Sequence, residues 1–148
     1  MNDPERDFSS ANPSLVVRLG GGALVLSGVL HLLLGLQSIL TVRWLDAMAY
    51  GPYALMALGV VAIGVGWKVT LARDWAASAG LALAIVLTLG TAAWTALNFG
   101  QGIFSLLSFG TVSVSVVSIV GTALAIDGCR RATAARRRLR AEGLDIGI

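Results

Sequence analysis

Charged residues interrupt the chain at only a few places, and the uncharged stretches between them can be compared with the thickness of a bilayer. Residues 19–42, 47–67 and 75–126 contain no aspartate, glutamate, lysine or arginine. A helix needs roughly 20 apolar residues to cross about 30 Å of hydrocarbon. The first two stretches can each hold one crossing, and the third is long enough for two. The pattern therefore predicts four membrane-spanning helices.

The long third stretch has one internal break, where residues 98–102 read Asn-Phe-Gly-Gln-Gly. Glycines and amides of this kind are typical of helix ends and turns. We predict spans at 19–40, 50–67, 76–97 and 103–126, between a mobile cytoplasmic segment at 1–18 and a basic cytoplasmic tail at 127–148. Three spans are the alternative, if the glycine-rich second segment only dips into the membrane.

The predicted spans are apolar on all sides, which favours helices over the strands of a barrel. Barrel strands alternate apolar and polar residues over roughly ten positions. A helix satisfies its own backbone hydrogen bonds inside lipid, where water is absent. The predicted fold class is therefore an all-α membrane protein, a bundle of four transmembrane helices.

Composition supports this class. Of the 148 residues, 56% are hydrophobic and only 13% are charged, whereas soluble domains carry about 25% charged residues. Intrinsic disorder is excluded as well, because disordered chains are poor in hydrophobic residues.

The basic residues predict the orientation. An even number of crossings places both ends on one side, together with every lysine and arginine except Arg43. Positive residues stay cytoplasmic in short loops. We therefore expect both termini in the cytoplasm and the chain in the plasma membrane, of the bacterial inner-membrane kind.

Small residues recur on one face of each predicted helix. The glycines that we expect to pack helices together are Gly21, Gly28 and Gly35 in the first span, and Gly59 and Gly66 in the second. Membrane helices associate through such close contacts, because lipid is as apolar as leucine and supplies no hydrophobic driving force.

The fourth span carries a stripe of hydroxyl residues at steps of three and four: Ser108, Thr111, Ser115, Ser118 and Thr122. This hydroxyl stripe has two interpretations. It can be a packing surface, where hydroxyls bond back to the carbonyl one turn earlier. It can instead line a wet path between several copies of the helix, since pore walls often use hydroxyls and amides.

Four other polar side chains lie at depth. His31 is the only histidine and lies near the middle of the first span. An ionisable residue there is a candidate for a proton-linked or cofactor-binding role, and a neutral imidazole bonded to a neighbouring helix is the alternative. Gln37, Asn98 and Gln101 lie toward the outer end, as a small polar vestibule or a clamp on the turns.

Material for catalysis is scarce. The sequence has no paired carboxylates at depth, no cysteine pair and no phosphate-binding glycine loop, which are the groups that enzyme sites need. One histidine and one cysteine cannot close a metal site. We expect no enzyme activity, no cofactor and no metal.

Six arginines follow the last span in an alanine-rich segment that favours helix: Arg130, Arg131, Arg136, Arg137, Arg138 and Arg140. We expect this segment to extend the fourth helix out of the membrane as far as Gly143. Anionic lipid attracts such residues by about 1 kcal/mol each. No aromatic residue is interleaved with them, so we expect anionic inner-leaflet lipid, and not nucleic acid, as their partner.

Three hypotheses of function follow. The first is a non-catalytic subunit whose helices pack against its own copies or another membrane protein. The second is a small oligomeric channel lined by the hydroxyl stripe. The third, which has the least support, is an enzyme or cofactor carrier centred on His31.

Overall fold

The computed structural model describes residues 12–41, 50–99 and 106–143, and its regular elements are all α-helices. They are α2 (Leu15–Thr41), α3 (Gly51–Thr70), α4 (Asp74–Phe99) and α5 (Leu106–Ala141). Each is long and apolar enough to cross a membrane. The part of the chain that the structure describes contains no strand, and the prediction of an all-α, four-helix membrane bundle is confirmed.

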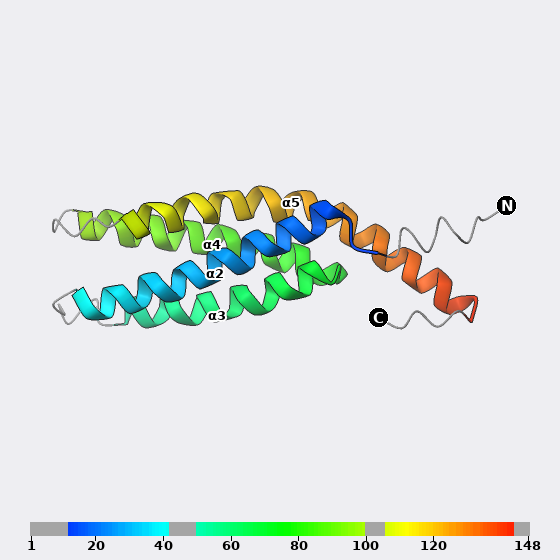
Figure 1. Cartoon of the computed structure of the whole chain (residues 1–148), viewed down its shortest axis with the longest axis horizontal. Coiled ribbons are helices and arrows are strands. Elements are labelled where there is room, and N and C mark those ends of the chain that lie inside the picture. Colours follow the sequence, from blue (N-terminus) through cyan, green and yellow to red (C-terminus); the bar gives the residue numbers. More distant parts are fainter. Residues whose placement is uncertain (1–11, 42–49, 100–105, 144–148) are drawn as a thin grey trace.

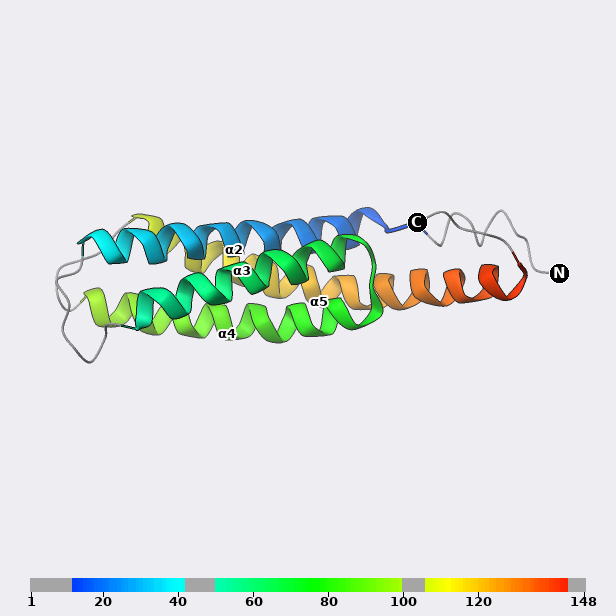
Figure 2. The same cartoon turned by 90° about the horizontal axis from the view of Figure 1, so that it is seen from below.

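The four helices run antiparallel to their neighbours along the chain (Figures 1 and 2). α2 packs most extensively on α3 and α5, and α4 packs on α5 and α3, so the contacts close a four-sided bundle. The start of α2 and the end of α5 lie at the same end of the molecule (Figure 1). That arrangement is the one an even number of crossings produces.

The helices match the predicted spans in the middle and extend further at the ends. α2 and α4 begin and end a few residues outside 19–40 and 76–97, and α3 begins at Gly51 and runs past 67. Residues 1–11, 42–49, 100–105 and 144–148 lie outside the described residues, and with them Gln101 and the start of the fourth predicted span.

α5 is the longest helix, with 36 residues. At 1.5 Å per residue it is about 54 Å long, which exceeds the hydrocarbon thickness of about 30 Å. Its apolar part ends at Ile126, and the alanine- and arginine-rich part that follows projects beyond the bundle (Figure 1). The helix ends at Ala141, and Gly143 follows with a φ of 76°, a conformation common after helix ends.

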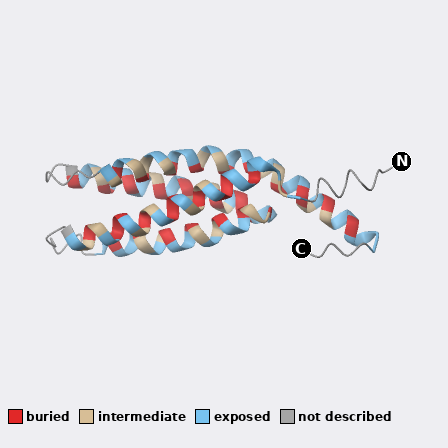
Figure 3. Cartoon of the chain, in the orientation of Figure 1, coloured by how far each residue is buried: buried red, intermediate tan, exposed pale blue. Residues whose placement is uncertain are grey.

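Many of the buried residues are small or polar, although Leu24 and Leu87 are buried as well, and many large apolar residues are exposed. Buried and exposed residues alternate along each helix (Figure 3). Ala62, Ala84 and Ala125 are fully buried, whereas Leu89 and Leu124 are more than 60% exposed. A soluble bundle has the opposite arrangement. Hydrocarbon must therefore cover the outer surface.

Exposed aromatic side chains lie near both ends of the bundle. Trp67 and Trp75 flank the turn between α3 and α4, and Tyr50 and Tyr53 lie at the start of α3; all four are more than 50% exposed. Tryptophan and tyrosine are enriched at membrane–water interfaces. Their positions mark two boundaries that are one helix length apart.

Candidate functional site

The three predicted packing glycines of α2 all face α3. Gly28 lies against Gly59, and a Cβ atom added to Gly28 would be 2.6 Å from the Gly59 carbonyl oxygen. The reverse also holds, because a Cβ on Gly59 would be 2.7 Å from the Gly28 carbonyl oxygen. Side-chain carbons do not approach other atoms so closely, so each glycine permits a backbone contact that no other residue allows.

This contact repeats along both helices. Gly21 faces Gly66, and Gly35 faces the carbonyl of Pro52. The residues are seven positions apart on each helix, in opposite chain directions, so one register aligns all three pairs. A repeat of seven keeps the same face turned toward the partner helix. We call this set of contacts the glycine seam.

The neighbouring contact between α2 and α5 uses glycines that the sequence reasoning did not single out. A Cβ on Gly20 would clash with the backbone of Gly121, and one on Gly128 would clash with Val17. The three consecutive glycines at 20–22 therefore face different surroundings. Gly20 faces α5, Gly21 faces α3, and a Cβ added to Gly22 would meet no atom within 4 Å. Gly121 and Gly128 are seven positions apart on α5, so the same spacing that marks the glycines of α2 could have identified them.

The hydroxyl stripe of α5 faces the interior of its own bundle. All five members are buried. Four of them donate to the carbonyl four residues earlier: Thr111 to Leu107, Ser115 to Thr111, Ser118 to Val114 and Thr122 to Ser118. Two also reach α2, since Ser115 Oγ lies 2.9 Å from Ser27 Oγ and Ser118 Oγ lies 2.9 Å from the Ala23 carbonyl oxygen.

His31 lies in the centre of the bundle and is fully buried. Its Nδ1 is 2.7 Å from the Ser27 carbonyl oxygen of its own helix, and its Nε2 is 2.6 Å from Thr91 Oγ1 of α4. A Cβ on Gly59 would approach the His31 Cβ to 3.2 Å. The glycine seam therefore also makes room for the imidazole.

The partners of His31 fix its tautomer. A carbonyl oxygen only accepts, so Nδ1 carries a proton. In a neutral ring, Nε2 then accepts the proton of the Thr91 hydroxyl. In a charged ring, Nε2 donates to Thr91 Oγ1, and the Thr91 proton turns to the Leu87 carbonyl oxygen, 2.6 Å away. Both forms of the ring leave its two nitrogens hydrogen-bonded.

At the end of the bundle where α2 and α4 end, the polar groups are held by these two helices. The Trp94 indole N–H donates to Ser38 Oγ at 3.3 Å, and Asn98 Nδ2 donates to the Trp94 carbonyl at 2.7 Å. Gln37, on the same helix as Ser38, is partly buried. The Asn98 amide thus satisfies a backbone carbonyl, as amides near turns often do.

At the opposite end, a tight turn joins α3 to α4. The Ala72 amide donates to the Val69 carbonyl and the Arg73 amide donates to the Lys68 carbonyl, which satisfies the end of α3. Ala72 has a φ of 51°, in the left-handed region that this type of helix end requires.

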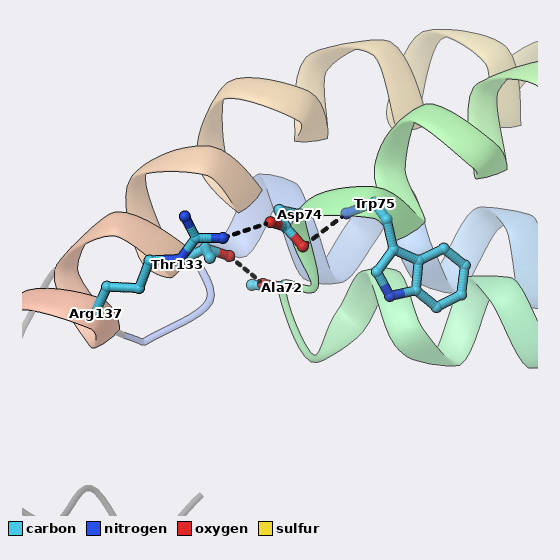
Figure 4. Close-up of polar contacts among 5 residues, drawn as sticks. All are labelled: Ala72, Asp74, Trp75, Thr133 and Arg137. Atoms are coloured by element: carbon cyan, nitrogen blue, oxygen red, sulfur yellow. Dashed lines mark hydrogen bonds and ion pairs between the residues drawn. The ribbon is translucent and has the colours of Figure 1, made fainter. Parts of the chain in front are cut away.

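The projecting part of α5 crosses this turn and holds it (Figure 4). Thr133 Oγ1 donates to the Ala72 carbonyl at 3.3 Å, and Arg137 pairs with the Asp74 carboxylate at 3.2 Å. Arg136 donates to the Leu71 carbonyl at 2.9 Å. Partial burial and the neighbouring Arg73 lower the pKa of the Arg136 guanidinium from its ordinary value. Of the other arginines after residue 126, Arg130, Arg131, Arg138 and Arg140 are exposed.

Metal ligands do not gather in the described residues, where no group of three histidine, cysteine or acidic side chains lies close enough to hold an ion. Cys129 is buried against α2 and the turn, in a cluster with Val17, Ala72 and Ala132.

Comparison with known proteins finds no protein-family model, no curated protein and no solved structure that matches this chain. Its function must therefore be inferred from its own residues.

Proposed function

We propose that this chain is a non-catalytic subunit of a membrane complex, and that it assembles with its own copies or with another membrane protein. The observation that carries the proposal is a contrast between its inside and its outside. The imidazole of His31 and the hydroxyl stripe are hydrogen-bonded within the chain, whereas small residues remain on the lipid-facing side of α3.

Inside the bundle, few polar groups are available to bind a transported solute or to take part in a reaction. Both ring nitrogens of His31 and the hydroxyls of Ser27, Ser115 and Ser118 have partners in the same chain. A wet path along the hydroxyl stripe would need these contacts to open. Burial of the stripe within a single chain thus supports its role in packing over its role as a pore lining.

Two grooves on the apolar part of the described bundle are lined almost entirely by apolar residues. One groove of about 420 Å³ between α2 and α5 is lined by aliphatic side chains and glycines. Another, of about 390 Å³ between α4 and α5, has the Thr95 hydroxyl as its one polar side chain. Such grooves suit acyl chains or apolar helices.

The outside of α3 carries a run of small residues. Ala54, Ala57 and Gly64 are exposed on one face of the helix, at steps of three and four with the larger Val61 between Ala57 and Gly64. A Cβ added to Gly64 would meet no atom of this chain within 4 Å. Small residues on a membrane helix permit close approach of another helix, so this face, the outer α3 face, is the proposed contact.

The orientation is part of the proposal. The end that holds the α3–α4 turn and the projecting part of α5 carries the arginines, so we place it in the cytoplasm, at a bacterial plasma membrane. The exposed arginines Arg130, Arg131, Arg138 and Arg140 would lie at the level of anionic headgroups.

The test is the mass of the complex after extraction of the whole chain in a mild detergent. We expect a mass of at least two chains, or a second protein that copurifies in a fixed ratio. Gly64→Leu should shift the mass toward that of one chain, because the larger side chain blocks close approach at the outer α3 face.

Gly22→Leu is the matched control, since Gly22 is also an exposed glycine with open space around it, but on α2. It should leave the mass unchanged. A single chain in the native extract, or equal effects of the two variants, would contradict the proposal.

A further inference from the structure

The single histidine of the chain has a polar partner at each ring nitrogen, and the hydrogens of this group can be counted. His31 Nδ1 lies 2.7 Å from the Ser27 carbonyl oxygen, and Nε2 lies 2.6 Å from Thr91 Oγ1. The same Thr91 oxygen lies 2.6 Å from the Leu87 carbonyl oxygen. Each of these three short contacts needs a hydrogen of its own to be a hydrogen bond. We call the imidazole, the hydroxyl and the two carbonyls the histidine site.

The neutral form of the histidine site has too few hydrogens for its contacts. A neutral imidazole carries one and the Thr91 hydroxyl carries one, while the carbonyl oxygens at both ends only accept. With the ring hydrogen on Nδ1, the hydroxyl donates either to Nε2 or to the Leu87 carbonyl. With the ring hydrogen on Nε2, the lone pair of Nδ1 faces the Ser27 carbonyl oxygen. Every neutral arrangement therefore leaves one of the three contacts without a hydrogen.

The charged form of the ring supplies the missing hydrogen. Nδ1 then donates to the Ser27 carbonyl, Nε2 donates to Thr91 Oγ1, and the Thr91 hydroxyl donates to the Leu87 carbonyl. All three contacts become hydrogen bonds, and each donor points at an acceptor. The two forms differ by one proton and by the rotation of one hydroxyl hydrogen. The bundle thus accepts the proton at this site without moving a heavy atom.

The described residues place no other charged side chain beside the histidine site. On α3, which touches His31 at Gly59, the nearest one is Lys68, about 14 Å farther along the helix. The nearest charged residues on the other helices are farther away still, and the remaining titratable groups of the described spans lie toward the helix ends: Arg18 on α2, Asp74 on α4, Asp127 and Cys129 on α5, and Tyr50 and Tyr53 at the start of α3. Carbonyl and hydroxyl dipoles alone would therefore stabilise the imidazolium, through hydrogen bonds that are stronger than those of the neutral ring.

A merely structural link between α2 and α4 would not need an imidazole. An amide side chain also offers one donor and one acceptor, and it carries no charge in either role. Histidine is the side chain whose charge changes most readily near neutral pH. Inside a membrane, ionisable residues are costly and mark proton-linked functions.

We propose that His31 is a reversible proton-binding site of the folded bundle, and that Thr91 is its switch. A hydronium ion gives its proton to the lone pair of Nε2 and leaves as water, so that the ring gains one positive charge. The Thr91 hydroxyl then turns its hydrogen from Nε2 to the Leu87 carbonyl. The site does not rest on the assembly proposed above, because all its groups belong to one chain.

The experiment follows the ring nitrogens of His31 by NMR in the whole chain in lipid bilayers, with isotope-labelled histidine and an affinity tag that contains no histidine. Because the sequence has one histidine, every labelled signal comes from this site. Between about pH 8 and about pH 4, we expect a neutral ring protonated at Nδ1 to become doubly protonated, and to return when the pH is raised. Tryptophan fluorescence of the same samples checks that the bundle stays folded.

Three variants test the part of the hydroxyl. Thr91→Val keeps the shape of the side chain but removes the acceptor of the Nε2 proton, whereas the neutral ring loses only a weaker hydrogen bond. Half-protonation should then need about ten times more protons, as expected for one hydrogen bond to a charged group. Thr88→Val is the matched control, since the Thr88 hydroxyl donates to the Ala84 carbonyl of its own helix. It should shift the midpoint less than about twofold, and so should Thr91→Ser, which keeps the hydroxyl.

Several results would overturn the proposal. One is a ring that stays neutral at every pH at which the bundle is folded, and another is a neutral ring that carries its hydrogen on Nε2. Equal midpoints for Thr91→Val and Thr88→Val would exclude the hydroxyl as the switch. If Thr91→Val does not fold, a midpoint of Thr91→Ser that moves about tenfold, or protonation of the native chain that is not reversed, contradicts the proposal in its place.

Discussion

α2 uses two kinds of contact with its neighbours, although one close glycine contact, Gly20 on Gly121, also joins it to α5. Toward α3 it presents glycines, and the two backbones touch at Gly28 and Gly59. Toward α4 and α5 it presents Ser27 and His31, and the contacts are hydrogen bonds between side chains. Both contacts lie in the same apolar surroundings, so the difference comes from the residues and not from the environment.

The contrast shows two ways to join helices where the hydrophobic effect is absent. The glycine seam gains dispersion contacts through close approach and tolerates no added atom. The polar contacts gain hydrogen bonds, which average only about 0.6 kcal/mol each in membrane proteins. We therefore expect the glycine seam to be the more sensitive of the two contacts to a small change.

The largest effect is expected for Gly28→Ala. The added methyl group would lie 2.6 Å from the Gly59 carbonyl oxygen, and a backbone atom cannot move aside as a flexible side chain can. We expect a loss of about 3 kcal/mol, the upper part of the range for overpacked cores. The free energy of unfolding in mixed micelles, titrated with a denaturing detergent, measures this loss.

Gly22→Ala serves as its control, since the added methyl group there meets no atom within 4 Å. The expected change is within about 0.5 kcal/mol, as for an ordinary surface substitution. Similar values for the two variants would show that close approach at Gly28 does not stabilise the bundle.

A smaller loss is expected for His31→Ala. The variant removes hydrogen bonds to the Ser27 carbonyl and to Thr91, and it leaves a cavity beside Gly59. We expect about 2 kcal/mol in the same unfolding measurement, from the cavity and the lost bonds together. Leu33→Ala, on the exposed side of α2, should cost clearly less, and a larger cost there would count against a structural role for the buried imidazole.

Much of the fold could be predicted because the membrane restricts it. The lengths of the uncharged stretches gave the number of membrane crossings. The glycines spaced seven residues apart marked the face of α2 that packs on α3. The hydroxyl stripe was also recognised in the sequence. However, packing within the bundle and lining of a pore both require these residues on one face of α5, so the sequence pattern could not distinguish the two. Only the contacts of Ser115 and Ser118 with α2 distinguish a stripe turned into its own bundle from one turned outward.

Other features depend on residues that are distant in the sequence. Thr91 meets His31 across sixty positions, and nothing local marks the pair. The contacts of Arg136 with Leu71 and of Arg137 with Asp74 depend on the helical phase that α5 keeps beyond Ile126. The vestibule suggested for Gln37, Asn98 and Gln101 stays a prediction, because Gln101 lies outside the described residues.

The most direct test of the central claim is a disulfide between α2 and α5. Ser27→Cys and Ser115→Cys, in a Cys129→Ala background, replace two side chains whose oxygens lie 2.9 Å apart. Mild oxidation in native membranes is followed by non-reducing electrophoresis, which separates single chains from linked pairs of chains. Mass spectrometry of the digested single-chain band should then find the two cysteines joined. A bond between two different chains would show that the hydroxyl stripe faces a neighbouring copy, and would contradict the self-contained bundle described above.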